Sequence, residues 1–357
     1  ILTEDLIDNL ALLGMTWGFL KYHHPEVGKG KYDWDDELFQ FLPEYMNVNN
    51  TRQRDELLLR WIEKYGEVPE CTTCKETAAD AYQKPDFTWI ENGNMSAALK
   101  EKIKEIRHQG THYYIQKAYY DGNPEFLNEQ PYSASFPDTN LRLLALYRYW
   151  NVIQYFSPYK YLTDKKWDEV LREYIPVFIN AKSALEYQLA ILQLAAETND
   201  THARLLLGAN ETGFFRGTKY APFRTNEIDS LRGTRYAPFR VRFIENKLTV
   251  TGYFKPNLKE TTGLEVDFIT HVNGKKIEYI IDSIESYYPA SNEAARKYYM
   301  STDLLRSNNN SIHIVYNSSG IIKQKELTMY ERSDLNMDEP NSKLSYDSIM
   351  IDKDSGF

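Results

Sequence analysis

The chain has 357 residues, a formal net charge of -9 and 42% hydrophobic residues. This length and composition allow two or three domains with ordinary buried cores and exclude a largely disordered protein. The acidic balance, without a long basic run, argues against strong binding to nucleic acid or acidic membranes and favours peptides or proteins as partners. No apolar run is long enough for a membrane span, and the first residue is Ile rather than Met, which is compatible with removal of a targeting segment.

Residues 1–69 contain the first of two related helical patterns. Shifting the numbering by 133 aligns this stretch with a later one without a gap, and the agreement of two tryptophans and two prolines predicts a tandem duplication of a helical unit. Pro43 and Pro176 lie within the predicted second helix of their copies, where we expect a break. The aligned pairs are Trp17 with Trp150, Tyr22 with Tyr155, Pro25 with Pro158, Trp34 with Trp167, Asp35 with Asp168, Leu38 with Leu171, Pro43 with Pro176 and Asn47 with Asn180.

Residues 70–138 form a mixed segment between the two copies. Cys71 and Cys74 allow four interpretations: a local disulfide, a redox pair, free thiols, or half of a zinc site completed by His108 and His112. An extracytoplasmic location would favour the disulfide. The rest of the segment predicts a helix over 97–109 capped by a serine, followed by a tyrosine-rich hairpin or covering loop that turns at residues 121–124.

Residues 139–208 hold the second copy, with two amphipathic helices and a third that begins after Ser183. The third helix stops at a polar cluster, and Asp200, Thr201, His202 and Ala203 follow directly. A histidine just past a helix end can be exposed beside a cleft, or it can be an ordinary loop residue bonded to Asp200. The first copy has Glu67 and Pro69 at the aligned positions. The Asp-Thr-His ending is therefore not required merely to complete the helical fold.

After residue 204 the apolar pattern alternates, as expected for strands. A nine-residue motif occurs twice, at 216–224 and 232–240, and only the second leads directly into a predicted strand. Hairpins are predicted with turns at Glu245-Asn246 and at Asn273-Gly274, which suit a small, partly open β-barrel. A helix over 292–305 and strands over 311–316 and 321–330 follow. Residues 333–357 are polar and predict a linker.

Three parts now stand in a specific order. A helical unit ends in Asp200-Thr-His-Ala203, a β-domain contains Asp267-Phe-Ile-Thr-His-Val-Asn-Gly-Lys275, and Pro289-Ala-Ser-Asn-Glu-Ala-Ala-Arg296 opens a helix. This order resembles the amino-terminal part of the tail-specific, or C-terminal processing, serine peptidases. It is most similar to the tricorn-core-like branch found in secreted proteins of Bacteroidetes-type bacteria.

The resemblance implies a PDZ-like domain over 215–332 that captures the carboxyl terminus of a peptide by adding it to a sheet edge. It also implies that His202 is the general base toward a serine nucleophile, with Asp200 and Thr201 in supporting roles. Ser307, Ser311, Ser318 and Ser319 lie in or beside the predicted strands, and none has the strand-to-helix context of a nucleophile. In the family the nucleophile belongs to a domain that would follow the linker.

The predicted fold class is multidomain α + β, with duplicated three-helix units followed by a PDZ-like small β-barrel that carries one or two helices. The predicted function is substrate handling in a secreted or periplasmic serine endopeptidase, with unfolded protein or peptide as partner, a peptidase domain as the second partner, and no cofactor. A peptide receptor without any peptidase domain is the alternative. A carbohydrate-binding surface protein, suggested by the abundant tyrosine and tryptophan, is a third.

Overall fold

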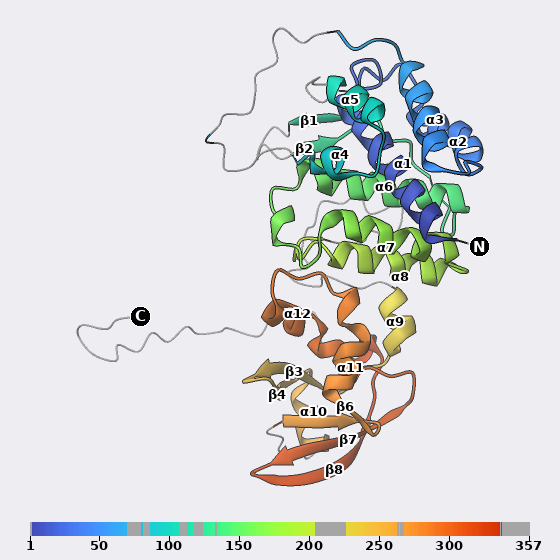
Figure 1. Ribbon diagram of the computed structural model, residues 1–357. Helices are drawn as coiled ribbons and strands as arrows, with labels where there is room; N and C mark the ends of the chain where they lie inside the picture. Colours follow the sequence, from blue (N-terminus) through green and yellow to red (C-terminus); the bar gives the residue numbers. More distant parts are fainter. Residues whose placement is uncertain are drawn as a thin grey trace. The chain divides into compact units, whose positions relative to one another are not determined.

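A computed structural model of the chain shows a mixed α/β protein (Figure 1). The structure describes residues 2–69, 80, 86–106, 113–117, 124–132, 134–203, 226–262, 264, 268–335 and 337. The chain divides into two compact units, Ile1–Asn199 and Asp200–Phe357. The Asp-Thr-His sequence therefore belongs to the second unit, although it follows directly on the last helix of the first.

The first unit is built mainly from helices around one apolar core. Its core draws on residues from Ile7 to Leu194, so the segment between the two helical patterns packs into the same interior as the patterns themselves. The elements are α1 (Glu4–His23), α2 (Trp34–Tyr45), α3 (Thr51–Glu63), α4 (Thr88–Asn92), α5 (Ala97–Ile106), β1 (Ile115–Lys117), β2 (Pro124–Phe126), α6 (Thr139–Phe156), η1 (Lys160–Leu162), α7 (Trp167–Asn180) and α8 (Ala184–Ala196).

Several of these elements repeat at the 133-residue offset seen in the sequence. Helices α2 and α7 begin 133 residues apart, and α3 and α8 both begin and end at that offset. The start of the third helix is also capped in the same way in both halves. Asn50 accepts a hydrogen bond from the Gln53 backbone N–H at 3.0 Å, and Ser183 accepts one from the Glu186 N–H at 3.2 Å.

The aligned tryptophans make the same contacts in both halves. The Trp17 indole N–H donates to the Trp34 carbonyl, and the Trp34 indole donates back to the Trp17 carbonyl, both at 3.0 Å. Trp150 and Trp167 form the same reciprocal pair, at 2.6 and 3.0 Å. All four rings are buried, so these bonds satisfy their only polar atoms and fix the start of the second helix against the first.

Helices α1 and α6 approach closely because α1 has glycine where they meet. A Cβ at Gly14 would lie 2.4 Å from the Tyr147 ring, and one at Gly18 would lie 1.9 Å from the Asn151 side chain. Asn151 uses this closeness to donate to the Gly14 carbonyl at 2.9 Å. Helix α1 is consequently apolar and buried around most of its circumference, as expected for a central helix.

The prediction that proline breaks the second helix of each pattern is wrong. Helix α2 continues through Pro43 to Tyr45, and α7 continues through Pro176 to Asn180. Each proline lies close to the carboxyl end of its helix, so only a short helical segment follows the lost backbone hydrogen bond. The buried residues around each proline keep the last turn in place.

The second unit is an antiparallel sheet with helices. The strand order is β3-β4-β5-β7-β8, with the short β6 paired to β5. Tyr236, before β3, and Tyr330, after β8, exchange backbone hydrogen bonds at 2.9 Å, but no described pairing joins β3 to β8 themselves. The expected barrel is therefore corrected to an antiparallel sheet that is not a closed barrel in the described residues. The elements are α9 (Asn226–Arg232), β3 (Phe239–Ile244), β4 (Lys247–Tyr253), α10 (Pro256–Thr262), β5 (Phe268–Val272), β6 (Lys275–Lys276), α11 (Ile277–Ile284), η2 (Glu285–Tyr287), α12 (Glu293–Met300), η3 (Ser301–Leu305), β7 (Ser311–Ser318), β8 (Ile321–Thr328) and η4 (Arg332–Asp334).

Two predicted hairpin turns are confirmed. Glu245 and Asn246 join β3 to β4 with φ of 48° and 60°, and Asn273 and Gly274 join β5 to β6 with φ of 48° and 77°. Positive φ at both central residues is typical of two-residue hairpin turns, whose backbone twist fits the twist of the flanking strands. The first copy of the nine-residue motif, 216–224, and Asp267 lie outside the described residues.

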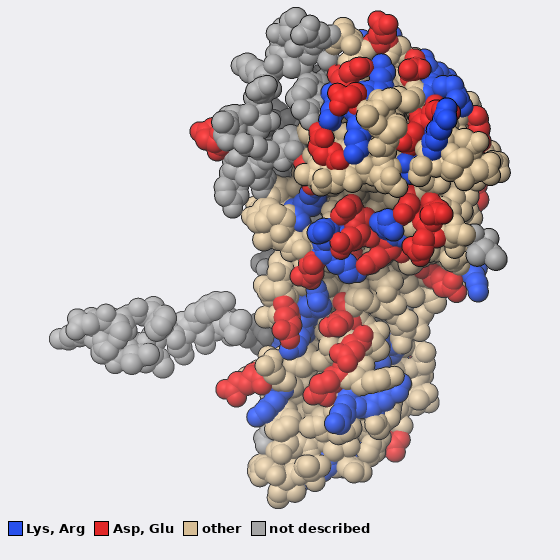
Figure 2. All heavy atoms as spheres, viewed as in Figure 1, with Lys and Arg blue, Asp and Glu red and all other residues tan. Residues whose placement is uncertain are grey.

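Among the helices that the structure describes, none combines the length and apolar character that crossing a membrane requires. On the face shown in Figure 2, acidic and basic side chains are interspersed over the described part of the first unit. This mixture of signs on that face agrees with the absence of a long basic run in the sequence.

We predict that His24 makes the first unit lose stability in acid. Burial lowers the pKa of His24 to about 4, and its Nδ1 accepts the Glu26 backbone N–H, which suits the neutral ring. The unfolded chain binds a proton near pH 6.5, so stability falls as pH drops from about 6.5 to about 4, by about 2 kcal/mol after allowance for solvent screening. Urea unfolding of wild type and His24→Asn across this range measures the effect.

The asparagine of the His24→Asn variant retains an acceptor for the Glu26 N–H but does not titrate, so the profile of this variant should be flatter than that of the wild type. Exposed His313 supplies the control, because His313→Asn should keep the wild-type slope. Equal slopes for His24→Asn and wild type would contradict the assignment.

We predict that Gly18→Ala destabilises the first unit although alanine favours helix. The helix preference contributes up to about 1 kcal/mol, whereas the clash with Asn151 costs about 1–3 kcal/mol or forces the helices apart. Asn151→Ala removes the obstructing side chain. The double variant should therefore be more stable than the sum of the two single effects predicts, and chemical denaturation of all four proteins measures this coupling. Strict additivity would show that this contact does not set the helix spacing.

Candidate functional site

The Asp200-Thr201-His202 sequence follows α8 through a tight polar turn. Thr198 closes the helix by donating its hydroxyl to the Ala195 carbonyl at 2.7 Å, and Asn199 takes a left-handed φ of 51°. Asn and Thr side chains favour such an ending because they bond to nearby backbone groups. The predicted stop of the third helix is thus confirmed.

His202 is exposed and is oriented by Asp200. The Nδ1 atom of its ring lies 2.9 Å from Asp200 Oδ1, and the same oxygen accepts the His202 backbone N–H at 2.8 Å. The side chain is 89% exposed, so the ring is not enclosed by the protein. Because Asp200 bonds to Nδ1, the other ring nitrogen, Nε2, points away from the carboxylate. A general base needs such a nitrogen to accept a proton from the nucleophile. The same bond also describes an ordinary loop histidine.

Thr201 contacts Ser291. Its hydroxyl lies 2.8 Å from that of Ser291, and each residue also donates its backbone N–H to the hydroxyl of the other, at 3.2 and 3.0 Å. These bonds tie the tripeptide to the segment that precedes α12. The structure therefore brings Asp200 and His202 together, and it gives Thr201 an anchoring role.

The four serines considered as nucleophiles all lie in strand or turn structure. Ser307 bonds through its backbone to Arg235, and Ser311 opens β7. Ser318 accepts from Lys323 at 3.1 Å, and Ser319 occupies the left-handed position of the β7–β8 turn. None of the four follows a strand into a helix, which agrees with the sequence-based expectation.

Strand β3 is an edge of the sheet, and α12 lies beside it. Among the described residues, β4 is the only strand that pairs along β3. The Arg242 guanidinium lies 4.3 Å from the centre of the Tyr298 ring, and Lys297 lies 5.6 Å from that of Phe243. These two contacts, from neighbouring residues of β3, place α12 next to this strand.

A buried ionic group holds the segment that leads into β3. Arg306 donates to the Gly233 carbonyl at 2.8 Å, pairs with Asp303 at 3.0 Å and with Asp229, and lies 4.7 Å from the Tyr236 ring. Its side chain is nearly inaccessible, so these partners compensate for the loss of water. These ion pairs were not predicted from the sequence. Two of the residues that contact Arg306, Gly233 and Tyr236, belong to the second copy of the nine-residue motif.

Within the described residues, no group of three or more His, Cys, Asp and Glu side chains is arranged to hold a metal ion. The four residues of the low-ranking zinc interpretation, Cys71, Cys74, His108 and His112, lie outside those residues. Their disulfide, redox, free-thiol and zinc interpretations therefore stay as the sequence left them.

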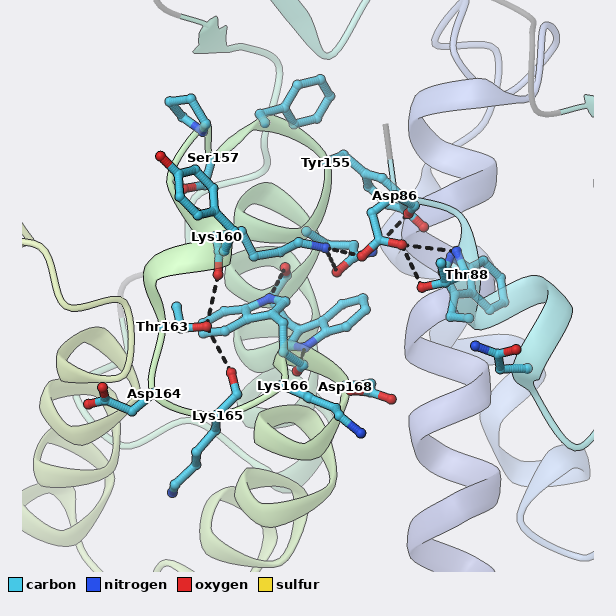
Figure 3. Close-up of a pocket in the computed structure, with 18 residues that line it drawn as sticks. Asp86, Thr88, Tyr155, Ser157, Lys160, Thr163, Asp164, Lys165, Lys166 and Asp168 are labelled. Carbon is cyan, nitrogen blue, oxygen red and sulfur yellow. Dashed lines mark hydrogen bonds and ion pairs between the residues drawn. The ribbon is translucent and has the colours of Figure 1, made fainter. Parts of the chain in front are cut away.

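The first unit contains a cleft of about 1170 Å³ between the end of α6 and the start of α7 (Figure 3). Burial raises the pKa of Asp86, but hydrogen bonds from Lys160 and Thr88 prevail and hold it at about 2. Lys160 also donates to Gln154 at 2.9 Å. The lining residues are Asp86, Thr88, Trp89, Asn92, Trp150, Gln154, Tyr155, Phe156, Ser157, Pro158, Lys160, Tyr161, Thr163, Asp164, Lys165, Lys166, Trp167 and Asp168.

This cleft was not predicted from the sequence, because the segment around Asp86 meets Lys160 only in the folded chain. The alignment pairs exposed Asp168 with buried Asp35. Burial raises the pKa of Asp35, against the lowering effect of Arg148 and Lys21. Among the described residues, Asp35 is therefore covered, whereas its counterpart Asp168 is exposed at the cleft.

No family model matches the chain, and no curated protein is significantly similar to it. The similarity to tail-specific peptidases therefore stays a prediction that depends on the order of three short motifs.

Proposed function

We propose that the chain is the substrate-handling part of a secreted or periplasmic serine endopeptidase, and that its second unit is a PDZ-like peptide-binding domain. The observation that carries this proposal is that, among the described strands, only β4 pairs along β3, while α12 lies next to β3. A peptide can extend such an edge through main-chain hydrogen bonds, while the adjacent helix supplies contacts for its side chains.

Arg242 is our candidate for the residue that recognises the peptide's carboxylate. Its guanidinium rests on the Tyr298 ring and donates to the Val241 carbonyl at 2.9 Å and to the Ser301 hydroxyl at 3.4 Å. These neutral partners leave its positive charge without an ionic partner among the described residues. A terminal carboxylate at this place would gain a charge-assisted hydrogen bond.

We also propose that the first unit arose by tandem duplication of a three-helix unit. The repeated helix bounds, the repeated caps and the two reciprocal indole pairs support this proposal. Each feature recurs at one offset of 133 residues, whereas unrelated helices packed by chance would not share a register.

We predict that the protein binds a peptide with a free carboxyl terminus about tenfold or more tightly than the same peptide as its amide. Loss of a charge-assisted bond explains this difference. Arg242→Gln should abolish it, and Lys247→Gln, which removes the same charge from the adjacent strand, should preserve it. Fluorescence anisotropy with labelled peptides measures each affinity.

Methylation of alternate backbone nitrogens in the peptide provides an independent control. It leaves the side chains unchanged but removes the N–H donors that strand addition needs, so binding should be lost. Equal affinity for the free acid and the amide, or full affinity of the methylated peptide, would argue against capture at the β3 edge.

We further propose that His202 is the general base of the peptidase, oriented by Asp200. In the full-length protein, His202→Ala should lower kcat by about a hundredfold or more, because proton transfer by a positioned base contributes that much. Peptide affinity should be unchanged. Steady-state cleavage of an unfolded substrate, combined with the anisotropy assay, separates the two effects. Unchanged turnover would show that His202 is a loop residue bonded to Asp200.

A peptide receptor without proteolytic activity is the alternative function. The structural roles of Ser307, Ser311, Ser318 and Ser319 favour it, because the described residues then supply a binding edge without a nucleophile. The two functions share the peptide assay and differ in whether the full-length protein cleaves its ligand.

A further inference from the structure

A segment of the chain itself covers the loop between α1 and α2. The Tyr113 backbone N–H donates to the Gly28 carbonyl at 3.2 Å, and the Tyr114 hydroxyl lies 3.5 Å from the Tyr32 carbonyl. The Tyr132 hydroxyl donates to Asp35 at 3.1 Å. The cover consists of the β1–β2 hairpin and the chain that follows it, so an extended polypeptide recognises this surface through its backbone and its phenols.

The aligned residues of the second half line the cleft. Residues 28, 32 and 35 correspond at the 133-residue offset to Tyr161, Lys165 and Asp168, all of which face the cleft. The side chain of Asp35 is 7% exposed under its cover, whereas Asp168 is exposed. The floor is the same reciprocal pair of buried tryptophans in both halves.

Part of the cover does have a counterpart over the second half. The Phe126 ring packs on Tyr22 at 6.3 Å and on Phe156 at 5.4 Å, and the Phe87 ring packs on the aligned residues, Tyr155 at 6.3 Å and His23 at 5.5 Å.

The polar contacts next to these rings correspond as well. Glu129 pairs with Lys21, and the Asp86 carbonyl accepts from the aligned Gln154 at 3.0 Å. Tyr113, Tyr114 and Tyr132 have no counterpart among the described residues over the second half. The surface that such a counterpart would cover is the cleft.

We propose that the cleft binds an extended polypeptide segment that carries a tyrosine, in the manner in which residues 113–117 and 124–132 cover the first half. The phenol would donate to the Asp168 carboxylate and stack beside Tyr161, whose side chain is 60% exposed. Backbone N–H groups of the bound segment would donate to carbonyls of the α6–α7 loop. This site lies within the first unit and is independent of the β3 edge.

The test uses a peptide copied from the cover itself, residues 128–134 (N-E-Q-P-Y-S-A), with a fluorescein at the amino end and an amide at the carboxyl end. The amide makes it a poor ligand for the proposed carboxylate site, so failure here is distinguishable from failure of the PDZ-like proposal. We expect saturable binding with a Kd below about 1 mM. Replacing the tyrosine of the peptide by alanine should weaken binding by about tenfold.

Variants of the full chain locate the binding site. Asp168→Asn and Tyr161→Ala should each weaken binding by about tenfold. The matched control is Glu169→Gln, which removes a charge from the same first turn of α7 outside the cleft and should bind as wild type does. A peptide with benzoylphenylalanine in place of the tyrosine should crosslink to residues 157–168 of the wild-type protein.

Three outcomes would overturn the proposal. They are the absence of saturable binding up to about 1 mM, equal affinity of Asp168→Asn and wild type, and crosslinks that map only to the second unit. Saturable binding of neutral oligosaccharides, without binding of the peptide, would likewise assign the cleft to a different ligand class.

Discussion

The contact between α1 and α6 is the constraint on which the first unit depends. Gly14 faces Tyr147, Gly18 faces Asn151, and Tyr22 packs on Tyr155 with ring centres 6.3 Å apart. Each pair is separated by 133 residues, so each position meets its own counterpart. This pattern arises only when the two helices run parallel and in register, related by an approximate two-fold axis along their length. Steps of four residues keep all three pairs on one face of each helix.

The two sides of this contact are complementary rather than equal. Two glycines at position 14 and its counterpart would leave a void, whereas two tyrosines would clash. One half supplies glycine, and the other fills the space with Tyr147 and Asn151. The filling residues also bond to the opposite backbone, since the Tyr147 hydroxyl donates to the Leu10 carbonyl at 2.6 Å. The Tyr147 and Asn151 side chains thus set both the spacing of the two helices and the hydrogen bonds between them.

Much of this architecture was predictable from the sequence, because its signals are local or periodic. The offset of 133 residues, the cap at Ser183 and the Asn273-Gly274 turn each follow from a few neighbouring residues. The helices continued through Pro43 and Pro176 because packing outweighed a local preference. The strand order could not be predicted from the sequence. Alternating apolar residues show which side chains share a face of a strand, but they do not show which strands pair.

The candidate sites were only partly predictable for the same reason. The Asp200–His202 pair lies within three residues, and the sequence placed it correctly after a helix end. Arg306 instead gathers Asp229 and Gly233 from more than 70 residues away. The cleft depends on the segment around Asp86 meeting Lys160, an ion pair between residues 74 positions apart. Such sites become visible only when the fold brings distant segments together.

One difference between the two halves explains why, among the described residues, only one of the two matching surfaces is open. Lys21 is 1% exposed, and burial lowers its pKa while Glu129 opposes that effect. Removing the cover would take Glu129 away from a buried cation, and an unpaired buried charge is strongly destabilising. The aligned Gln154 is neutral, and Asp86 and Lys160 satisfy its amide without any further cover. The second half therefore tolerates an open surface over the same tryptophan floor, whereas the first half must keep its surface closed.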